Sequence, residues 1–277
     1  MMSNVLKIAK KELADLLGNI IVPIVIFVYL IIILSSAYGI KDQVSGGIGN
    51  EDQFVVIVLS SLYWDLKTYG GILALIIGFY SLSSEKVGSA LSTIVAKPVY
   101  RDNIINGKLI GCTLFITCIF LLATALYLAS LLIIVGPPFG KILAVFLEKS
   151  LVIVVLTLVC SLMIMCLSML ISLLVRDRGI ALLSCAVLFV FLAITFPSVS
   201  FLSNIAMLFG EGEEQVSYII GSFSPYSMLN TVIYDMLANT DVLSVLLHYS
   251  QWIAEFVIGL VIAMAANYIA FVRRDIS

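Results

Sequence analysis

Residue types that support catalysis are scarce in this chain. There is a single histidine, His248, so the chain cannot form an HExxH zinc site or any multi-histidine metal centre. Gly107-Lys108 has the last two residues of a phosphate-binding loop, but Asp102 stands where that loop needs its first glycine, and Leu109 stands where it needs Ser or Thr. We therefore expect no catalytic residue, no metal site and no cofactor held by this chain.

A carboxylate and a group of sulfur atoms lie in apolar stretches. Glu255 follows Trp252 by three residues, about 4.5 Å along a helix. It is either a pathway or gating residue or an acid tolerated near a membrane interface. Sulfur atoms are ligands that suit Cu(I). Side chains at positions 160, 163, 166 and 169, however, spread over half of the circumference of a helix and do not converge on one point. This spacing favours a packing role over a role in metal passage. The residues concerned are Cys160, Met163, Met165, Cys166 and Met169.

The composition determines which elements can position these residues. Hydrophobic residues make up 62% of the 277 and charged residues 12%, against about 45–50% and about 25% in soluble domains. The mean hydropathy is +1.17. These values predict an all-α integral membrane protein with one transmembrane domain, residues 1–277. Uncharged stretches indicate six spans: Leu16–Ile40, Thr68–Ser84, Leu109–Gly140, Ser150–Val175, Gly179–Gly210 and Phe256–Val272.

Further helices are predicted outside the spans. Residues 1–18 place apolar and basic side chains on opposite helical faces, which favours an amphipathic helix at the membrane interface over a solvated extension of the first span. In the outer loop, residues 211–249, Ser224 is a good N-cap and Pro225 suits the first helical position. Residues 225–237 would cover only about 20 Å. They therefore form either a short re-entrant hairpin before the last span or an amphipathic helix lying flat on the outer surface.

Basic residues predict the orientation, because short cytoplasmic loops retain Lys and Arg. With both termini in the cytoplasm, the outer loops are acidic overall and include Asp65 and Lys67. Eleven of the 15 basic residues then lie on the inner side. They are Lys7, Lys10, Lys11, Lys86, Lys97, Arg101, Lys108, Arg176, Arg178, Arg273 and Arg274. These residues follow the membrane boundaries, so we expect contact with lipid and no nucleic-acid partner.

The inner loop between the second and third spans, residues 85–108, has the most specific pattern. Glu85 and Gly88 precede a short apolar helix at Ser89–Ala96. This helix must end before Pro98, because a proline disfavours the helical conformation at the residue before it. A second helical start is predicted a few residues later. From the residues alone, the segment is equally well explained as a basic turn with no further role.

The loop resembles the inner-loop signature of ABC-2 type transporter permeases. The matching positions are Glu85, Gly88, Leu91, Lys97, Pro98, Arg101, Gly107 and Lys108. The opening segment, residues 8–16, is similar to the amphipathic N-terminal helix of that family. The predicted six spans and the longer outer loop before the last span also agree with the family's architecture. The length and the N-terminal segment also resemble the permeases associated with multi-copper enzyme maturation.

The resemblance implies an exporter permease in the cell membrane. The loop 85–108 would dock on a separate ATP-binding subunit, which would hold ATP and Mg²⁺, and would transmit its closure. A second copy or a homologue would pair with this chain, with a homodimer as the expected form, and substrate would pass along the first, second and fifth spans. The alternative is an ion-gradient-driven secondary carrier or a channel-like protein, although the sequence has no inverted internal repeat of the kind carriers use.

Overall fold

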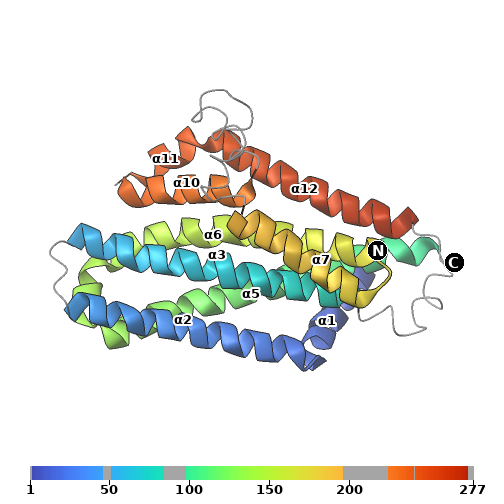
Figure 1. Cartoon of the computed structure of the whole chain (residues 1–277), viewed down its shortest axis with the longest axis horizontal. Helices are drawn as coiled ribbons and strands as arrows, with labels where there is room; N and C mark the ends of the chain where they lie inside the picture. Colours follow the sequence, from blue (N-terminus) through green and yellow to red (C-terminus); the bar gives the residue numbers. More distant parts are fainter. Residues whose placement is uncertain (1, 46–50, 84–97, 196–223, 240, 274–277) are drawn as a thin grey trace.

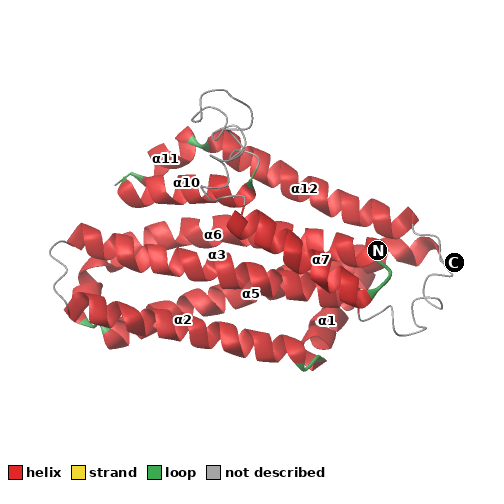
Figure 2. Ribbon diagram, in the orientation of Figure 1, coloured by secondary structure: helices red, strands yellow, loops and turns green. Residues whose placement is uncertain are grey.

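The computed structural model describes residues 2–45, 51–83, 98–195, 224–239 and 241–273. Every regular element within these ranges is a helix, as Figure 2 shows. This confirms the predicted all-α fold.

Five helices in the described part of the chain are long and apolar enough to cross a membrane. They are α2 (Ile21–Ser45), α3 (Glu51–Ser83), α5 (Pro98–Ile134), α6 (Pro137–Leu174) and α12 (Ser250–Arg273). In Figure 1, α2, α3, α5 and α6 run side by side with alternating direction, and α12 packs on α6. Their buried apolar side chains form one continuous core. The chain is therefore a multi-pass membrane protein.

Helix α1 (Met2–Gly18) begins, and α12 ends, at the same end of the bundle, here called the α1 end (Figure 1). Helix α7 (Arg178–Val190) starts from this end and continues into one π-helical turn, Phe191–Thr195. Helix α10 (Pro225–Ala238) ends at the opposite end. The predicted fifth span, Gly179–Gly210, thus begins as α7, and its second half lies outside the described residues. The count of six spans stays a prediction.

The predicted start of the second span was wrong. It was placed at Thr68, with Asp65 and Lys67 in the outer loop, but α3 is continuous from Glu51 and contains all three residues. Asp65 and Lys67 are each only 5% exposed. The prediction followed the charge-free stretch, whereas a helix keeps charged residues inside a bundle when neighbouring helices supply polar surroundings.

The turn between α5 and α6 also comes earlier than predicted. Gly136 has a φ of 70°, in the left-handed region that residues with a side chain rarely adopt. The amide of Val135 donates to the Leu131 carbonyl at 2.9 Å. Pro137 then starts α6 at a position where no amide donor is needed. Residues 141–149, predicted as an outer loop, are therefore helical.

The helices predicted at residues 1–18 and 225–237 are present as α1 and α10, whereas the short helix predicted at Ser89–Ala96 lies outside the described residues. Helix α1 crosses the end of the bundle and packs against α5. At α10 the Ser224 side chain accepts from the Ser227 amide at 3.3 Å, as the N-cap prediction requires. Asp241 caps the next helix, α11 (Val242–His248), by accepting from the Leu243 amide. The position of α1 at a membrane interface stays a prediction.

Small residues bring α3 and α6 into close contact. A Cβ at Gly78 of α3 would overlap the Ser168 side chain and the Met165 carbonyl of α6. Small residues at helix contacts are a common means of association in membranes. Four of the five sulfur residues of α6 are buried: Cys160, Met165, Cys166 and Met169. Their packing role, favoured by their spacing, agrees with this burial.

Candidate functional site

The predicted coupling loop is only partly within the described residues. Glu85, Gly88, Leu91 and Lys97 lie outside them. Pro98 is the first residue of α5, and Arg101 lies in its first turn. Gly107 and Lys108, two turns further along, are described with their surroundings.

Lys108 lies inside the protein and joins three helices. Its Nζ lies 2.6 Å from Oε2 of Glu12 on α1 and donates at 2.8 Å to the carbonyl of Ser81 at the end of α3. Both charged side chains are almost fully buried, with exposed fractions of 4% and 6%. A buried charge must be paired and hydrogen-bonded to be tolerated. Lys108 therefore holds α1, α3 and α5 together.

Gly107 sets how closely α1 approaches α5. A Cβ at this position would lie 2.7 Å from the side chain of Ile8 and 3.1 Å from the carbonyl of Val5, both on α1. One turn along α5, a Cβ at Gly111 would lie 3.0 Å from the Ala9 carbonyl. This close contact brings Glu12 within reach of Lys108.

A second cation reaches the end of α3. Arg178, the first residue of α7, donates from its guanidinium to the Ser83 carbonyl, and Asp177 caps α7 by accepting from the Ile180 amide at 2.9 Å. The last carbonyls of a helix lack intrahelical donors and carry partial negative charge, so cations stabilise them. The helices that flank residues 84–97 are thus fastened to α1 and α7.

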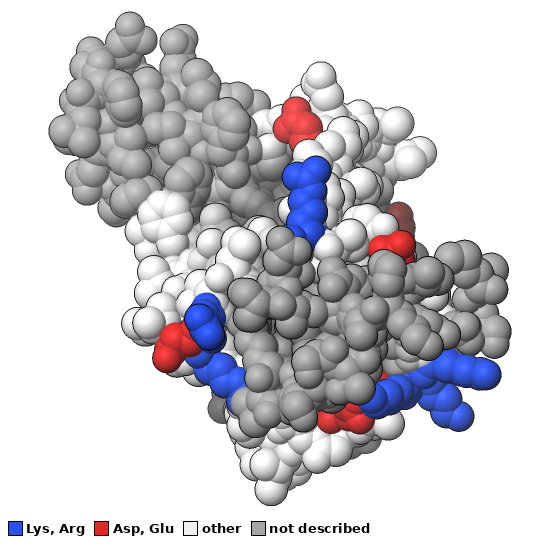
Figure 3. Space-filling model, turned by 90° about the vertical axis from the view of Figure 1, so that its right-hand side faces the viewer, with Lys and Arg blue, Asp and Glu red and all other residues white. Residues whose placement is uncertain are grey.

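The α1 end carries more basic than acidic side chains among the residues described there. Figure 3 looks onto this end and shows lysine and arginine side chains at several places. The basic residues are Lys7, Lys10, Lys11, Lys108, Arg176, Arg178 and Arg273, and the acidic ones are Glu12, Asp15, Asp102 and Asp177. The described side chains at the opposite end have an acidic excess: Lys41, Lys141 and Lys149 against Glu51, Asp52, Glu148, Asp235 and Asp241.

A family model described as "ABC-2 family transporter protein" matches residues 6–276, nearly the whole chain. The chain belongs to this family. No curated protein matches it. The chain is therefore a transmembrane permease, and ABC-2 permeases typically partner with an ATP-binding subunit. The match is to the family as a whole, so the resemblance to the multi-copper maturation subset stays a prediction.

A second polar cluster of this ABC-2 permease holds α10, and we call it the α10 clamp: Tyr63, Lys67, Lys149 and Asn230. Tyr63 and Lys67 of α3 both donate to Oδ1 of Asn230 on α10, Lys67 at 2.8 Å. Lys149 of α6 donates at 2.8 Å to the carbonyl of Asn239, where α10 ends. The clamp fixes the short helix α10 at both its middle and its end.

The α10 clamp was not predicted from the sequence, because Lys67 and Lys149 were expected in outer loops. A usable signal was present. Between Glu51 and Thr68 the sequence has neither proline nor glycine, so nothing breaks a helix before the charged pair. The partner Asn230 is a polar residue between the apolar residues Leu229 and Val232 of the predicted 225–237 helix, a position where a buried polar side chain needs a hydrogen bond.

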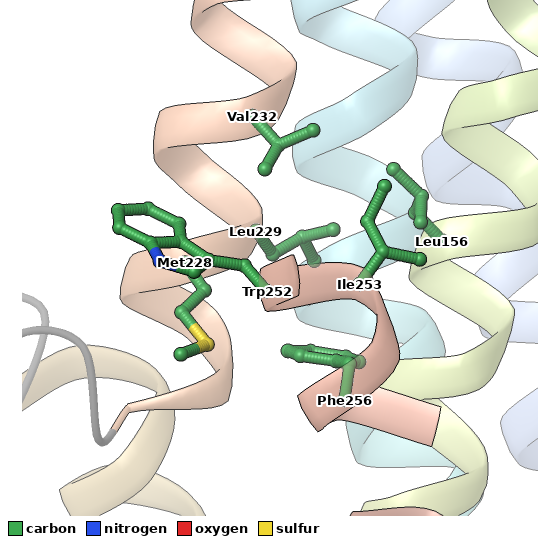
Figure 4. Close-up of a pocket in the computed structure, with 7 residues that line it drawn as sticks. All are labelled: Leu156, Met228, Leu229, Val232, Trp252, Ile253 and Phe256. Atoms are coloured by element: carbon green, nitrogen blue, oxygen red, sulfur yellow. The ribbon is translucent and has the colours of Figure 1, made fainter. Parts of the chain in front are cut away.

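The structure does not bring Glu255 together with the other candidate residues. Glu255 is exposed on α12. Its neighbour Phe256 points into an apolar pocket between α6, α10 and α12, which Figure 4 shows. Leu156, Leu229 and Trp252 are among the lining side chains. A pathway or gating role for Glu255 stays a prediction.

Proposed function

We propose that this permease exports a substrate across the cell membrane, driven by ATP hydrolysis on a separate subunit that docks on the loop 85–108. Family membership supports the permease part. The observation that carries the coupling is Lys108, which ties α5 to the Ser81 carbonyl of α3 and to Glu12 of α1. An ATPase that moves the loop would therefore act on three helices at once.

The buried ion pair would make this coupling stiff. Removing one partner of a buried pair costs about 3–5 kcal/mol, because the other charge is left uncompensated. A force applied to the start of α5 would therefore move α1 together with α5 and would not first break the contact between Lys108 and Glu12. The permease would do no chemistry of its own, and ATP and Mg²⁺ would be bound by the partner.

Charge supports an orientation with both termini in the cytoplasm. The α1 end has the basic excess, which is typical of the cytoplasmic side of a membrane protein. Pairing with a second copy or a homologue would use one side of α2, which exposes a row of large apolar residues. They are Ile24, Phe27, Val28, Ile31 and Leu34. A homodimer would place the pathway between two such surfaces.

One observation favours a second candidate, an ion-gradient-driven carrier. Asp65 and Lys67 are buried in the interior of α3, and ionisable residues inside membrane helices commonly mark ion or proton pathways. A carrier would transport without any ATPase, and its rate would follow a proton or sodium gradient. This difference separates the two functions experimentally.

The decisive experiment is co-purification from membranes of the tagged full-length chain with an ATPase, followed by measurement of ATP hydrolysis. We expect a stable complex. Arg101→Glu together with Pro98→Ala should weaken it, because these residues start the helix that leaves the loop. Lys141→Glu is the matched control: it reverses one exposed charge at the opposite end and should leave the complex intact.

Two results would contradict the proposal. One is transport by the purified chain that needs no ATPase and follows an ion gradient, which would favour the carrier. The other is unchanged ATPase binding and stimulation in the Arg101 and Pro98 variant, which would remove the loop 85–108 from the interface.

A further inference from the structure

A polar cavity lies between α2 and α3 and is open to the surface beside the exposed side chain of Trp64. Its volume is about 450 Å³, within the range of sites that hold small organic ligands. Three serine hydroxyls line it, from Ser36 of α2 and from Ser60 and Ser61 of α3, and Asp65 supplies the charge. A cavity of this polarity inside a membrane protein calls for a polar occupant.

Asp65 is the group that decides which occupant fits. The residue is 95% buried, and its Oδ2 has no hydrogen-bond partner. Among the described residues, no lysine or arginine forms an ion pair with it. The nearest basic residue along α3, Lys67, donates to Asn230 and lies 4.9 Å from the centroid of the Trp64 ring. Lys67 thus stabilises α10 and leaves the carboxylate unneutralised.

We infer that this cavity binds a small organic cation, with an ammonium group that donates to Asp65 and to the serine hydroxyls. A buried carboxylate oxygen without a partner is costly, and an ammonium supplies both the charge and the donors that it lacks. A bare divalent ion fits less well, because the cavity is large and the described residues hold no cluster of three or more His, Cys, Asp or Glu side chains. The statement that this cation is the transported cargo rests on the proposed function. The statement that the cavity binds the cation does not.

Gly39 and Asp65 allow the cavity and its charge to be tested separately. Asp65→Asn removes the charge and keeps the side-chain shape. Gly39 of α2 lines the cavity, and a Cβ there would meet no heavy atom within 4 Å. Gly39→Leu therefore adds bulk to the cavity lining at a position with room for its Cβ, and it improves the helix propensity of α2. Glu51→Gln is the control, since it neutralises an exposed acid on the same helix.

Trp64 also lines the cavity and can report binding by its fluorescence. The full-length chain with Trp252→Phe keeps Trp64 as its single tryptophan. In phosphatidylcholine nanodiscs it is titrated with two nitroxide quenchers of similar size, the cationic 4-amino-TEMPO and the neutral 4-hydroxy-TEMPO. We expect the amine to quench at a concentration at least tenfold lower, because a hydrogen bond between charged groups adds that much to affinity. Trp64→Phe, which reports from Trp252 instead, should show no such preference.

Asp65→Asn should abolish the preference for the amine. Gly39→Leu should raise the concentration at which both probes quench. Glu51→Gln should change neither the preference nor the quenching concentrations. Equal quenching by the two probes in the parent chain would overturn the inference. So would a preference that persists in Asp65→Asn, or no quenching because a second copy covers the cavity. No ATPase enters this measurement, so a failed ATPase complex with a clear amine preference would refute the proposed function alone. An intact complex without the preference would refute this inference alone.

Discussion

Removing either charge of the buried pair Glu12–Lys108 should destabilise the permease strongly, whereas removing both should not. The informative variants are Glu12→Leu, Lys108→Met and their combination. Each replacement is apolar, similar in size and compatible with a helix. The pair is well suited to this test, because its atoms are 2.6 Å apart and both side chains are buried.

The expected magnitudes follow from the contacts. Each single variant removes one member of the pair and leaves the other charge buried without it, at a cost of about 3–5 kcal/mol. Lys108→Met also deprives the Ser81 carbonyl of its donor, which adds about 1 kcal/mol. The double variant removes both charges of the pair together and takes the donor from that carbonyl, so its stability should lie within about 1–2 kcal/mol of the parent. The two single effects should therefore far exceed the double effect.

The measurement is equilibrium unfolding of the purified chain in mixed detergent and SDS micelles, followed by tryptophan fluorescence. The exposed pair Lys141–Glu51 is a control, since its atoms lie 3.7 Å apart and its side chains are 71% and 70% exposed. Neutralising that pair should change the unfolding free energy by less than about 1 kcal/mol. A double variant at Glu12 and Lys108 that loses the sum of both single effects would refute the reasoning, because it would mean that the two side chains act independently.

Three other substitutions probe the remaining contacts. Gly107→Val should push Ile8 and α1 away from α5, lowering the unfolding free energy by about 1–3 kcal/mol and ATPase stimulation with it. Asn230→Ala should leave the donor of Lys67 unpaired and cost about 1–3 kcal/mol, and protease cleavage of α10 in intact vesicles should become faster. Gly78→Leu should destabilise most, because its side chain meets backbone of α6, and size-exclusion chromatography should show loss of the folded monodisperse peak.

Much of the fold could be predicted, because local signals determine it. The apolar stretches give the long helices, and the capping residues Ser224 and Asp241 mark the starts of α10 and α11. The errors have one physical cause. Spans were delimited by absence of charge, and the structure keeps Asp65, Lys67 and Lys149 inside helices, where other helices surround them with polar groups.

The candidate site was less predictable, because its contacts join distant parts of the sequence. The family signature includes Gly107 and Lys108 but does not show what they contact. Lys108 and Glu12 are 96 residues apart, and Lys67 and Asn230 are 163 apart. Helical periodicity predicts on which face of its helix a residue lies, but it does not predict which residue of another helix it contacts. Only the packing of α1 on α5 shows that the Lys108 side chain is buried and paired with Glu12.

Helix α3 connects the two polar clusters, and its construction suits it to carry displacement. Its 33 residues extend about 50 Å. At one end its carbonyls are held by Lys108 and Arg178, and further along Lys67 holds α10. Between these points the contact of Gly78 with the backbone of α6 leaves little room for α3 to bend or rotate alone. A displacement that starts at residue 84 therefore has to move α3 and α6 together, and with them α10 and one wall of the Asp65 cavity. A packed rod held at one end and at its middle transmits such a shift as a rigid-body movement, without a chain of side-chain rearrangements between the two points.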